Sequence, residues 1–368
     1  MKKIHFLAIR QDGIIDYLLA PVLYNQKALK ERGFDISFFY KPSDTCLQCD
    51  ILCLLSKAVM PMLHDQNTYL QPDGPVIQFI QKARQFTNKI IWFDTSDSTS
   101  VTHFELLPYV DFYLKKQLLK DLTLYQKPFY GGRIFTDFYH QHFNITDDVP
   151  FDQFHPLSLE DMHKVGLSWN IGLGNLIQSG TRKAYYKRFF ADYLPISYAV
   201  DFHQTTNKTI DIFLSTSANL KRTSVAFHRQ ELVRRLRDIQ QKHQLSGAIN
   251  GPRLPDEAFR QTMSATKIMP SPFGWGELGL RDYEAFIYGA TLLKPSMNHM
   301  TTWPNIFIEN ETYQPFQWDF SDLEEHIQNL LSSPSKRVAL AQNGQDIYRQ
   351  SISKQGMAQF CDWFIQQL

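Results

Sequence analysis

Residues 271 to 290, SPFGWGELGLRDYEAFIYGA, hold the residue types whose spacing is most suggestive of chemistry. The pattern predicts a strand that ends near Met269, a glycine-containing loop, and a helix that begins near Leu280. The first N–H groups of such a helix lack partners inside the helix and, with its dipole, bind anions, most often a phosphate. Gly276 and Gly279 would let a ligand approach the backbone closely. A second interpretation is that these glycines only shape a tight turn.

The same stretch, extended to PSPFGWGELGLRDYEAFIYGATLLKP, resembles the donor-site segment of GT-B glycosyltransferases. The resemblance is to the retaining family 4, or group 1, type, whose pattern is E-G-F-G-L-P-x-x-E-A-x-x-x-G-x-P-V-I, and the spacing also resembles the exostosin-like branch. Glu284 matches the second glutamate of that pattern and Gly289 its later glycine. Gly276 stands where the first glutamate is expected, and Glu277 follows one residue late. The whole chain is also similar to bacterial transferases of surface polysaccharide synthesis.

This resemblance implies an α/β fold of two Rossmann-like domains that face each other across a cleft. It also implies a nucleotide-sugar donor bound by the second domain. Helix amides and cations would then stabilise the charge that develops on the diphosphate leaving group, and Glu284 would bind the ribose hydroxyls. The residues expected at the donor are Lys221, Arg222, Gly276, Glu277, Leu278, Gly279, Leu280, Arg281 and Glu284. For Lys221 and Arg222, a solvated pair at a helix start is the alternative.

Short apolar runs alternate with longer amphipathic runs in both halves of the chain, which predicts parallel sheets with helices on both faces. Strands are predicted at 4–9, 35–40, 50–56, 89–93 and 109–114, then at 209–215, before 271 and at 290–295. Helices are predicted at 16–33, 76–86, 224–242 and from a capping box at Ser321. We expect an acceptor-side domain at 1–195 and a nucleotide-sugar-binding domain at 209–345. A final helix at 346–368 would pack back toward the first domain.

In parallel sheets, ligands lie at the carboxyl ends of the strands. The loops after the first and fourth strands therefore supply the candidate catalytic carboxylates, Asp12 and Asp94, one of which would take the proton from an acceptor hydroxyl. Asp94 and its neighbours could instead be ordinary helix caps. On the acceptor side we expect Asp97, Arg133 and His140. His140 and His142 alternate as on one strand face, and no third metal ligand is evident, so no essential metal is predicted.

Composition limits the partners. Lys and Arg number 38 against 37 Asp and Glu, so the net charge of +1 gives no reason to expect a nucleic-acid partner. The N-terminal apolar run is too short for a signal peptide, and no run reaches the length of a membrane span, so we expect a cytoplasmic protein. A peripheral position at the inner membrane stays open.

Cys46, Cys49 and Cys53 are expected to be structural thiols, and His228 and Arg229 to lie on a solvated helix face.

The function predicted from the sequence is metal-independent transfer of a sugar from a nucleotide-sugar to a glycan or lipid-linked acceptor, with no cofactor. Two alternatives stay open. One is a sugar-nucleotide 2-epimerase of the same fold, and the other is a catalytically silent relative that binds nucleotide or glycan. The sugar, the nucleobase, the oligomeric state and the retention or inversion of the anomeric configuration are not predicted.

Overall fold

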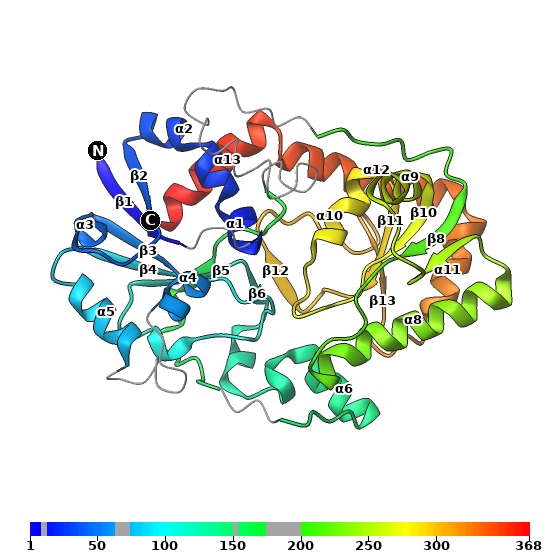
Figure 1. The fold of residues 1–368 in the computed structure, drawn as a ribbon, viewed down its shortest axis with the longest axis horizontal. Helices are drawn as coiled ribbons and strands as arrows, with labels where there is room; N and C mark the ends of the chain where they lie inside the picture. The colour runs from blue at the N-terminus through cyan, green and yellow to red at the C-terminus, as the bar shows by residue number, and fades with distance from the viewer. Residues whose placement is uncertain (9–12, 63–73, 150–153, 174–199) are drawn as a thin grey trace.

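The computed structural model describes residues 1–8, 13–62, 74–149, 154–173 and 200–368. The chain forms two α/β halves that lie side by side, with the N-terminal half on the left of Figure 1 and the C-terminal half on the right. Each half has its own parallel sheet with helices packed around it. This is the GT-B arrangement of two Rossmann-like domains, so the predicted fold class is confirmed.

The sheet of the N-terminal half has the order β2-β1-β3-β4-β5-β7, and all of its neighbouring strands are parallel. Its most buried strands, such as ILCLL, are almost continuously apolar because helices cover both faces. Its strands are β1 (Lys2–Leu7), β2 (Phe34–Phe39), β3 (Ile51–Leu55), β4 (Lys89–Asp94), β5 (Phe112–Lys115) and β7 (Val165–Leu167). The helices of this half are α1 (Gly13–Tyr24), α2 (Gln26–Glu31), α3 (Asp44–Leu47), α4 (Ser56–Met62) and α5 (Pro75–Ala83). The next helix, α6 (Ile134–Phe143), packs instead on α8 (Thr223–His243) of the C-terminal half (Figure 1).

The C-terminal sheet has the order β13-β11-β10-β8-β9, again all parallel. Its strands are β8 (Ile210–Leu214), β9 (Gly247–Ile249), β10 (Thr266–Pro270), β11 (Thr291–Pro295) and β13 (Gln314–Phe316). Its helices are α8 (Thr223–His243), α9 (Asp256–Ala265), α10 (Leu280–Ile287), α11 (Leu323–Ser332) and α12 (Pro334–Ser351). The last helix, α13 (Lys354–Gln367), returns to the N-terminal half and packs on α1 and α2 (Figure 1). Its apolar face joins the core of the first domain.

The two halves are joined by more than the chain that connects them. Strand β6 (Gln117–Leu119) pairs antiparallel with β12 (Met300–Thr302), so one small sheet has a strand from each half. One hydrophobic cluster also contains Tyr17 and Tyr24 of α1 together with Phe286 of α10. Among the described residues, no helix is both long enough and apolar enough to cross a membrane.

Three details of the sequence prediction were wrong. The helix predicted over 16–33 is two helices, α1 and α2, interrupted at Asn25. Helix α11 begins after Asp322 rather than at a Ser321 capping box, and the Asp322 carboxylate instead accepts from the Gln317 N–H. Residues 134–143 form helix α6, not a strand. The linker position Pro195 lies outside the described residues.

Candidate functional site

The loop at 271–279 leaves the carboxyl end of β10 and leads into α10, as the sequence predicted. Gly279 is the N-cap residue, in extended backbone conformation. Asp282, three residues later, accepts a hydrogen bond from the Gly279 N–H at 2.8 Å. This bond is one half of a capping box. Glycine has no side chain to make the other half, and the Asp282 N–H donates to the Gly279 carbonyl instead, at 3.1 Å.

Asp282 also forms a buried ion pair. The Lys294 Nζ atom, on β11, lies 2.9 Å from Asp282 Oδ1, and neither side chain is exposed to solvent. The Ser271 hydroxyl donates to the same oxygen. Burial lowers the pKa of Lys294, and the charge of Asp282 and its hydrogen bond oppose that effect. The pair ties α10 to the sheet and fixes the N-terminus of the helix.

Glu284 lies one turn into α10 and is the candidate ribose-binding residue. Its carboxylate is paired with Arg281 at 2.7 Å, and 23% of the side chain remains exposed. Burial raises the pKa of Glu284, the charge of Arg281 opposes this, and Asp282 adds to the rise. Burial also raises the pKa of Tyr17 on α1, and the next contribution is the charge of Glu284. Glu284 is therefore close enough to Tyr17 of the N-terminal half for their charges to interact, and part of its side chain remains exposed.

Gly276 and Glu277 contact the N-terminal domain directly. A Cβ atom at Gly276 would lie 1.6 Å from the Asp97 carbonyl oxygen, so any other residue would force the loop to shift. The Glu277 carboxylate is fully buried and accepts hydrogen bonds from the Thr99 N–H at 3.0 Å and the Thr99 hydroxyl at 2.7 Å. Ser98 and Gln117 donate to it as well. In this structure Glu277 holds the two domains together and has no surface for a sugar.

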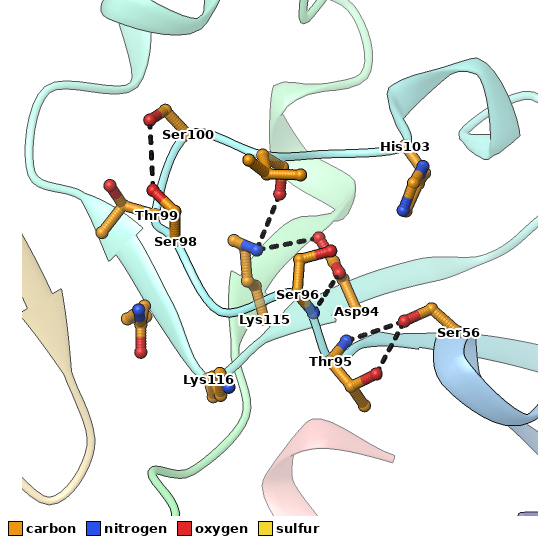
Figure 2. Close-up of polar contacts among 12 residues, drawn as sticks. Ser56, Asp94, Thr95, Ser96, Ser98, Thr99, Ser100, His103, Lys115 and Lys116 are labelled. Atoms are coloured by element: carbon orange, nitrogen blue, oxygen red, sulfur yellow. Dashed lines mark hydrogen bonds and ion pairs between the residues drawn. The ribbon is translucent and has the colours of Figure 1, made fainter. Parts of the chain in front are cut away.

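The loop after β4 provides the other side of this contact, and Figure 2 shows its polar network. Asp94 ends β4 and is fully buried against the Lys115 Nζ atom at 2.9 Å. The Tyr113 hydroxyl and the Ser96 N–H also donate to Asp94. Burial alone would raise the pKa of Asp94, but Lys115, then His103 and these hydrogen bonds outweigh it and lower the pKa. Such a carboxylate is a weak proton acceptor, so the geometry does not favour Asp94 as the base.

The other acceptor-side candidates also have partners within the protein. Asp97 is bound by Lys116 at 2.9 Å, with Lys57 at 3.6 Å. The Arg133 Nε atom donates to the Trp275 carbonyl at 2.8 Å, so Arg133 does lie beside the candidate donor loop. Burial lowers the pKa of Arg133 to about 10.

His140 and Arg222 are linked through Tyr130 and Asp147, because the Asp147 N–H donates to the Tyr130 hydroxyl. His140 stacks on Tyr130 in α6 with ring centroids 3.8 Å apart. Arg222, at the N-terminus of α8, is paired with Asp147 at 3.1 Å, whereas Lys221 is exposed. Asp12 lies outside the described residues. The roles assigned to these residues stay predictions.

The prediction that His228 and Arg229 lie on a solvated face was wrong. His228 is fully buried between Phe273 and Phe320, and burial lowers its pKa. Arg229 donates to the Phe273 carbonyl at 2.9 Å and so connects α8 to the candidate donor loop. The amphipathic pattern of α8 does not reveal this, because the groups that contact the two side chains, Phe273 and Phe320, are distant in sequence.

Sequence reasoning also missed three residues that shape the site, namely Lys115, Asp282 and Lys294. The available signal was a lysine at the end of an apolar strand, in YLK and in TLLK, where a buried cation requires a carboxylate partner. No group of three or more potential ligands among the described residues could hold a metal ion.

No protein-family model and no curated protein sequence matches the chain. Solved structures resemble it at low identity. HepE from Anabaena, in complex with UDP-glucose, is 12% identical over the whole of both chains with a TM-score of 0.44. An alpha-glucosyltransferase in complex with UDP is 10% identical over the whole of both chains, with a TM-score of 0.44.

A third structure, a UDP-N-acetylglucosamine 2-epimerase homologue from Listeria monocytogenes, is 12% identical over 95% of this chain and 94% of that one, with a TM-score of 0.40.

Proposed function

We propose that the protein is a glycosyltransferase that moves a sugar from a nucleotide-sugar donor to a glycan or lipid-linked acceptor without an essential metal ion. The observation that carries the proposal is the placement of the 271–289 segment. It follows a strand of the second parallel sheet, it presents the N-terminus of α10, and Glu284 lies one turn later, partly exposed and close to Tyr17 of the first domain. The sequence motif and the geometry thus agree at the same edge of the sheet.

The residues around this segment would have different roles in donor binding. Asp282 and Lys294 hold α10 in place, so the amides at its N-terminus are fixed before a ligand arrives. Glu284 would accept hydrogen bonds from the ribose hydroxyls, and the nearby Arg281 would contribute positive charge toward the diphosphate. Preorganised donors of this kind stabilise leaving-group charge without a metal, at no reorganisation cost during the reaction.

The test is transfer itself. The purified protein is incubated with UDP-, GDP-, CMP-, dTDP- and ADP-sugars plus a panel of glycan acceptors, with EDTA present, and the products are read by mass spectrometry. We expect release of one nucleotide together with a glycosylated acceptor. A donor converted to its epimer without an acceptor would identify a 2-epimerase, and a strict requirement for Mn²⁺ would contradict the metal-independent mechanism.

One observation favours a second candidate. Glu277, the glutamate nearest to the first motif position, is buried in the domain contact and cannot reach a sugar in this structure. A catalytically silent protein that binds a nucleotide at α10 would show this feature. In that case nucleotide binding would be measurable while transfer and donor hydrolysis were both undetectable.

A further inference from the structure

Trp275 is the most exposed of the six tryptophans in the chain, at 39%. It stands at the tip of a tight turn in the candidate donor loop, where the Gly274 N–H donates to the Gly276 carbonyl at 2.9 Å. Among the described residues, none accepts a hydrogen bond from its indole N–H. Gly276, the next residue, lies against Asp97 of the first domain. A large aromatic surface and a hydrogen-bond donor are therefore open to solvent where the two domains meet.

Arg133, the residue before α6, holds this turn in place. Its Nε atom donates to the Trp275 carbonyl at 2.8 Å, and its Cζ atom lies over the indole ring, 5.2 Å from the ring centroid. Its Nη1 atom donates to the Gly131 carbonyl at 2.9 Å. The backbone and the ring of Trp275 thus contact one buried guanidinium. An aromatic side chain fixed in this way loses little conformational entropy when a ligand binds to it.

The positive charge of Arg133 has no direct counter-ion in the described part of the chain. Arg133 is only 8% exposed, yet the two groups to which it donates are neutral carbonyls. Its Nη2 atom donates to none of the described residues. Buried charges in proteins are normally paired, because burying an unpaired charge is costly. A guanidinium of this kind is well suited to bind an anion that comes from outside the chain.

The carboxylates around Arg133 are bound by other groups. Burial has the largest influence on the pKa of Arg133, and the charges of Glu277, Arg222, Asp97 and Asp147 follow. The three carboxylates accept hydrogen bonds or ion pairs from Thr99, Lys116 and Ser224, respectively. Arg222 adds a second positive charge. An anion beside Trp275 would therefore meet positive charge without displacing a carboxylate from Arg133.

We propose that Trp275 and Arg133 form the binding site for an acceptor sugar that carries a negatively charged group, a carboxylate or a phosphate. The apolar face of the sugar ring would pack on the indole, and the indole N–H would donate to a sugar hydroxyl. Arg133 would bind the charged group. As an acceptor site it rests on the proposed function. The place of Trp275 at the domain contact, and not on α10, favours the acceptor over the donor as its ligand.

The test uses three sugars that differ at C6, namely methyl glucuronide, glucose 6-phosphate and methyl glucoside. Each is titrated into the protein alone and with UDP, GDP, CMP, dTDP or ADP present. Binding is followed by the NMR signal of the Trp275 indole N–H, which is assigned with Trp275→Phe. We expect at least one charged sugar to shift this signal and the neutral glucoside to bind at least about tenfold more weakly, because a charge-assisted hydrogen bond is stronger than a neutral one.

Two variants separate the contributions of the two residues. Arg133→Met should remove the preference for a charged sugar. Arg235→Met is the matched control, because Arg235 lies over the Phe320 ring at the same 5.2 Å but is paired with Glu231. It should keep the preference. Trp275→Ala, followed by saturation transfer to the sugars, should lose the binding of all three.

Three results would overturn the site, and the wild type alone supplies them if a variant fails to fold. One is an indole signal that no sugar shifts, with or without a nucleotide. Another is equal binding of the charged sugars and the neutral glucoside. The third is a nucleotide that displaces the charged sugar, which would make Trp275 part of the donor site. Nucleotide binding at α10, measured separately, tests the proposed function, so the two can fail independently.

Discussion

Each half of the molecule contains one buried lysine–aspartate pair at the carboxyl edge of its sheet. The Asp94–Lys115 pair and the Asp282–Lys294 pair have the same 2.9 Å separation and the same complete burial. The two pairs differ in the element that carries the aspartate. Asp94 ends strand β4, and its pair joins two neighbouring strands and the loop after them. Asp282 belongs to helix α10, and its pair joins a helix to the sheet.

This difference gives the two pairs different roles: the N-terminal pair supports the domain contact, and the C-terminal pair supports the candidate ligand site. The N-terminal pair shapes residues 95–101, which receive Glu277 and Gly276 from the other domain. The C-terminal pair fixes the helix N-terminus that is the candidate donor site. Both pairs should matter for stability, but only the second should matter directly for ligand binding.

The largest effect is expected when one partner of a pair is removed. Asp94→Ala and Asp282→Ala each leave a buried lysine without a counter-charge, so each should reduce the free energy of unfolding by about 3–5 kcal/mol. Urea denaturation measures this loss. Nucleotide affinity is then measured without urea, at a temperature where both variants remain folded. It should fall for Asp282→Ala and stay near the wild-type value for Asp94→Ala. Equal losses of nucleotide affinity in the two variants would contradict the different roles assigned to the two pairs.

Acid should weaken the contact between the two regions. Burial would raise the pKa of Glu277, but His299 and the Thr99 hydrogen bonds lower it from 4.5 to about 2. The folded pKa is depressed, so the stabilisation is present above the unfolded value and is lost as pH falls from about 4.5 to about 2. It amounts to about 3 kcal/mol at pH 7.

Urea unfolding across this pH window measures the effect. Glu277→Gln should show a shallower decline in stability with falling pH than the wild type. Glu324→Gln serves as the control, because Glu324 is an exposed ion-pair residue. An unchanged slope in Glu277→Gln would show that Glu277 is not held as described.

A smaller effect is expected from crowding the contact. Gly276→Ala places a methyl group against the Asp97 carbonyl and should cost about 1–3 kcal/mol as the loop shifts. Gly279→Ala, three residues away, meets nothing within 4 Å and should cost ~0.5 kcal/mol. Thermal unfolding of the two alanine variants compares them directly. A Gly276→Ala variant as stable as Gly279→Ala would mean that the domains do not meet at this point.

Much of the fold could be predicted from the sequence, because apolar runs such as KIIWF and TIDIFLS have strand length and alternate with amphipathic helices. The loop before α10 could also be placed, because its glycines stand between a strand and a helix pattern. What could not be predicted depends on contacts distant in sequence. Glu277 meets Thr99 across 178 positions, and no local pattern distinguishes a glutamate that binds a ligand from one that binds the other domain.

The central claim is that α10 and Glu284 form a nucleotide site. The most direct measurement is calorimetric titration of the wild type and Glu284→Ala with UDP, GDP, CMP, dTDP and ADP, with and without Mg²⁺ or Mn²⁺. We predict that one nucleotide binds selectively and without metal, and that Glu284→Ala weakens its binding about tenfold, or 1.4 kcal/mol, with an unchanged melting temperature. No binding of any nucleotide, or equal affinity in Glu284→Ala, would contradict it.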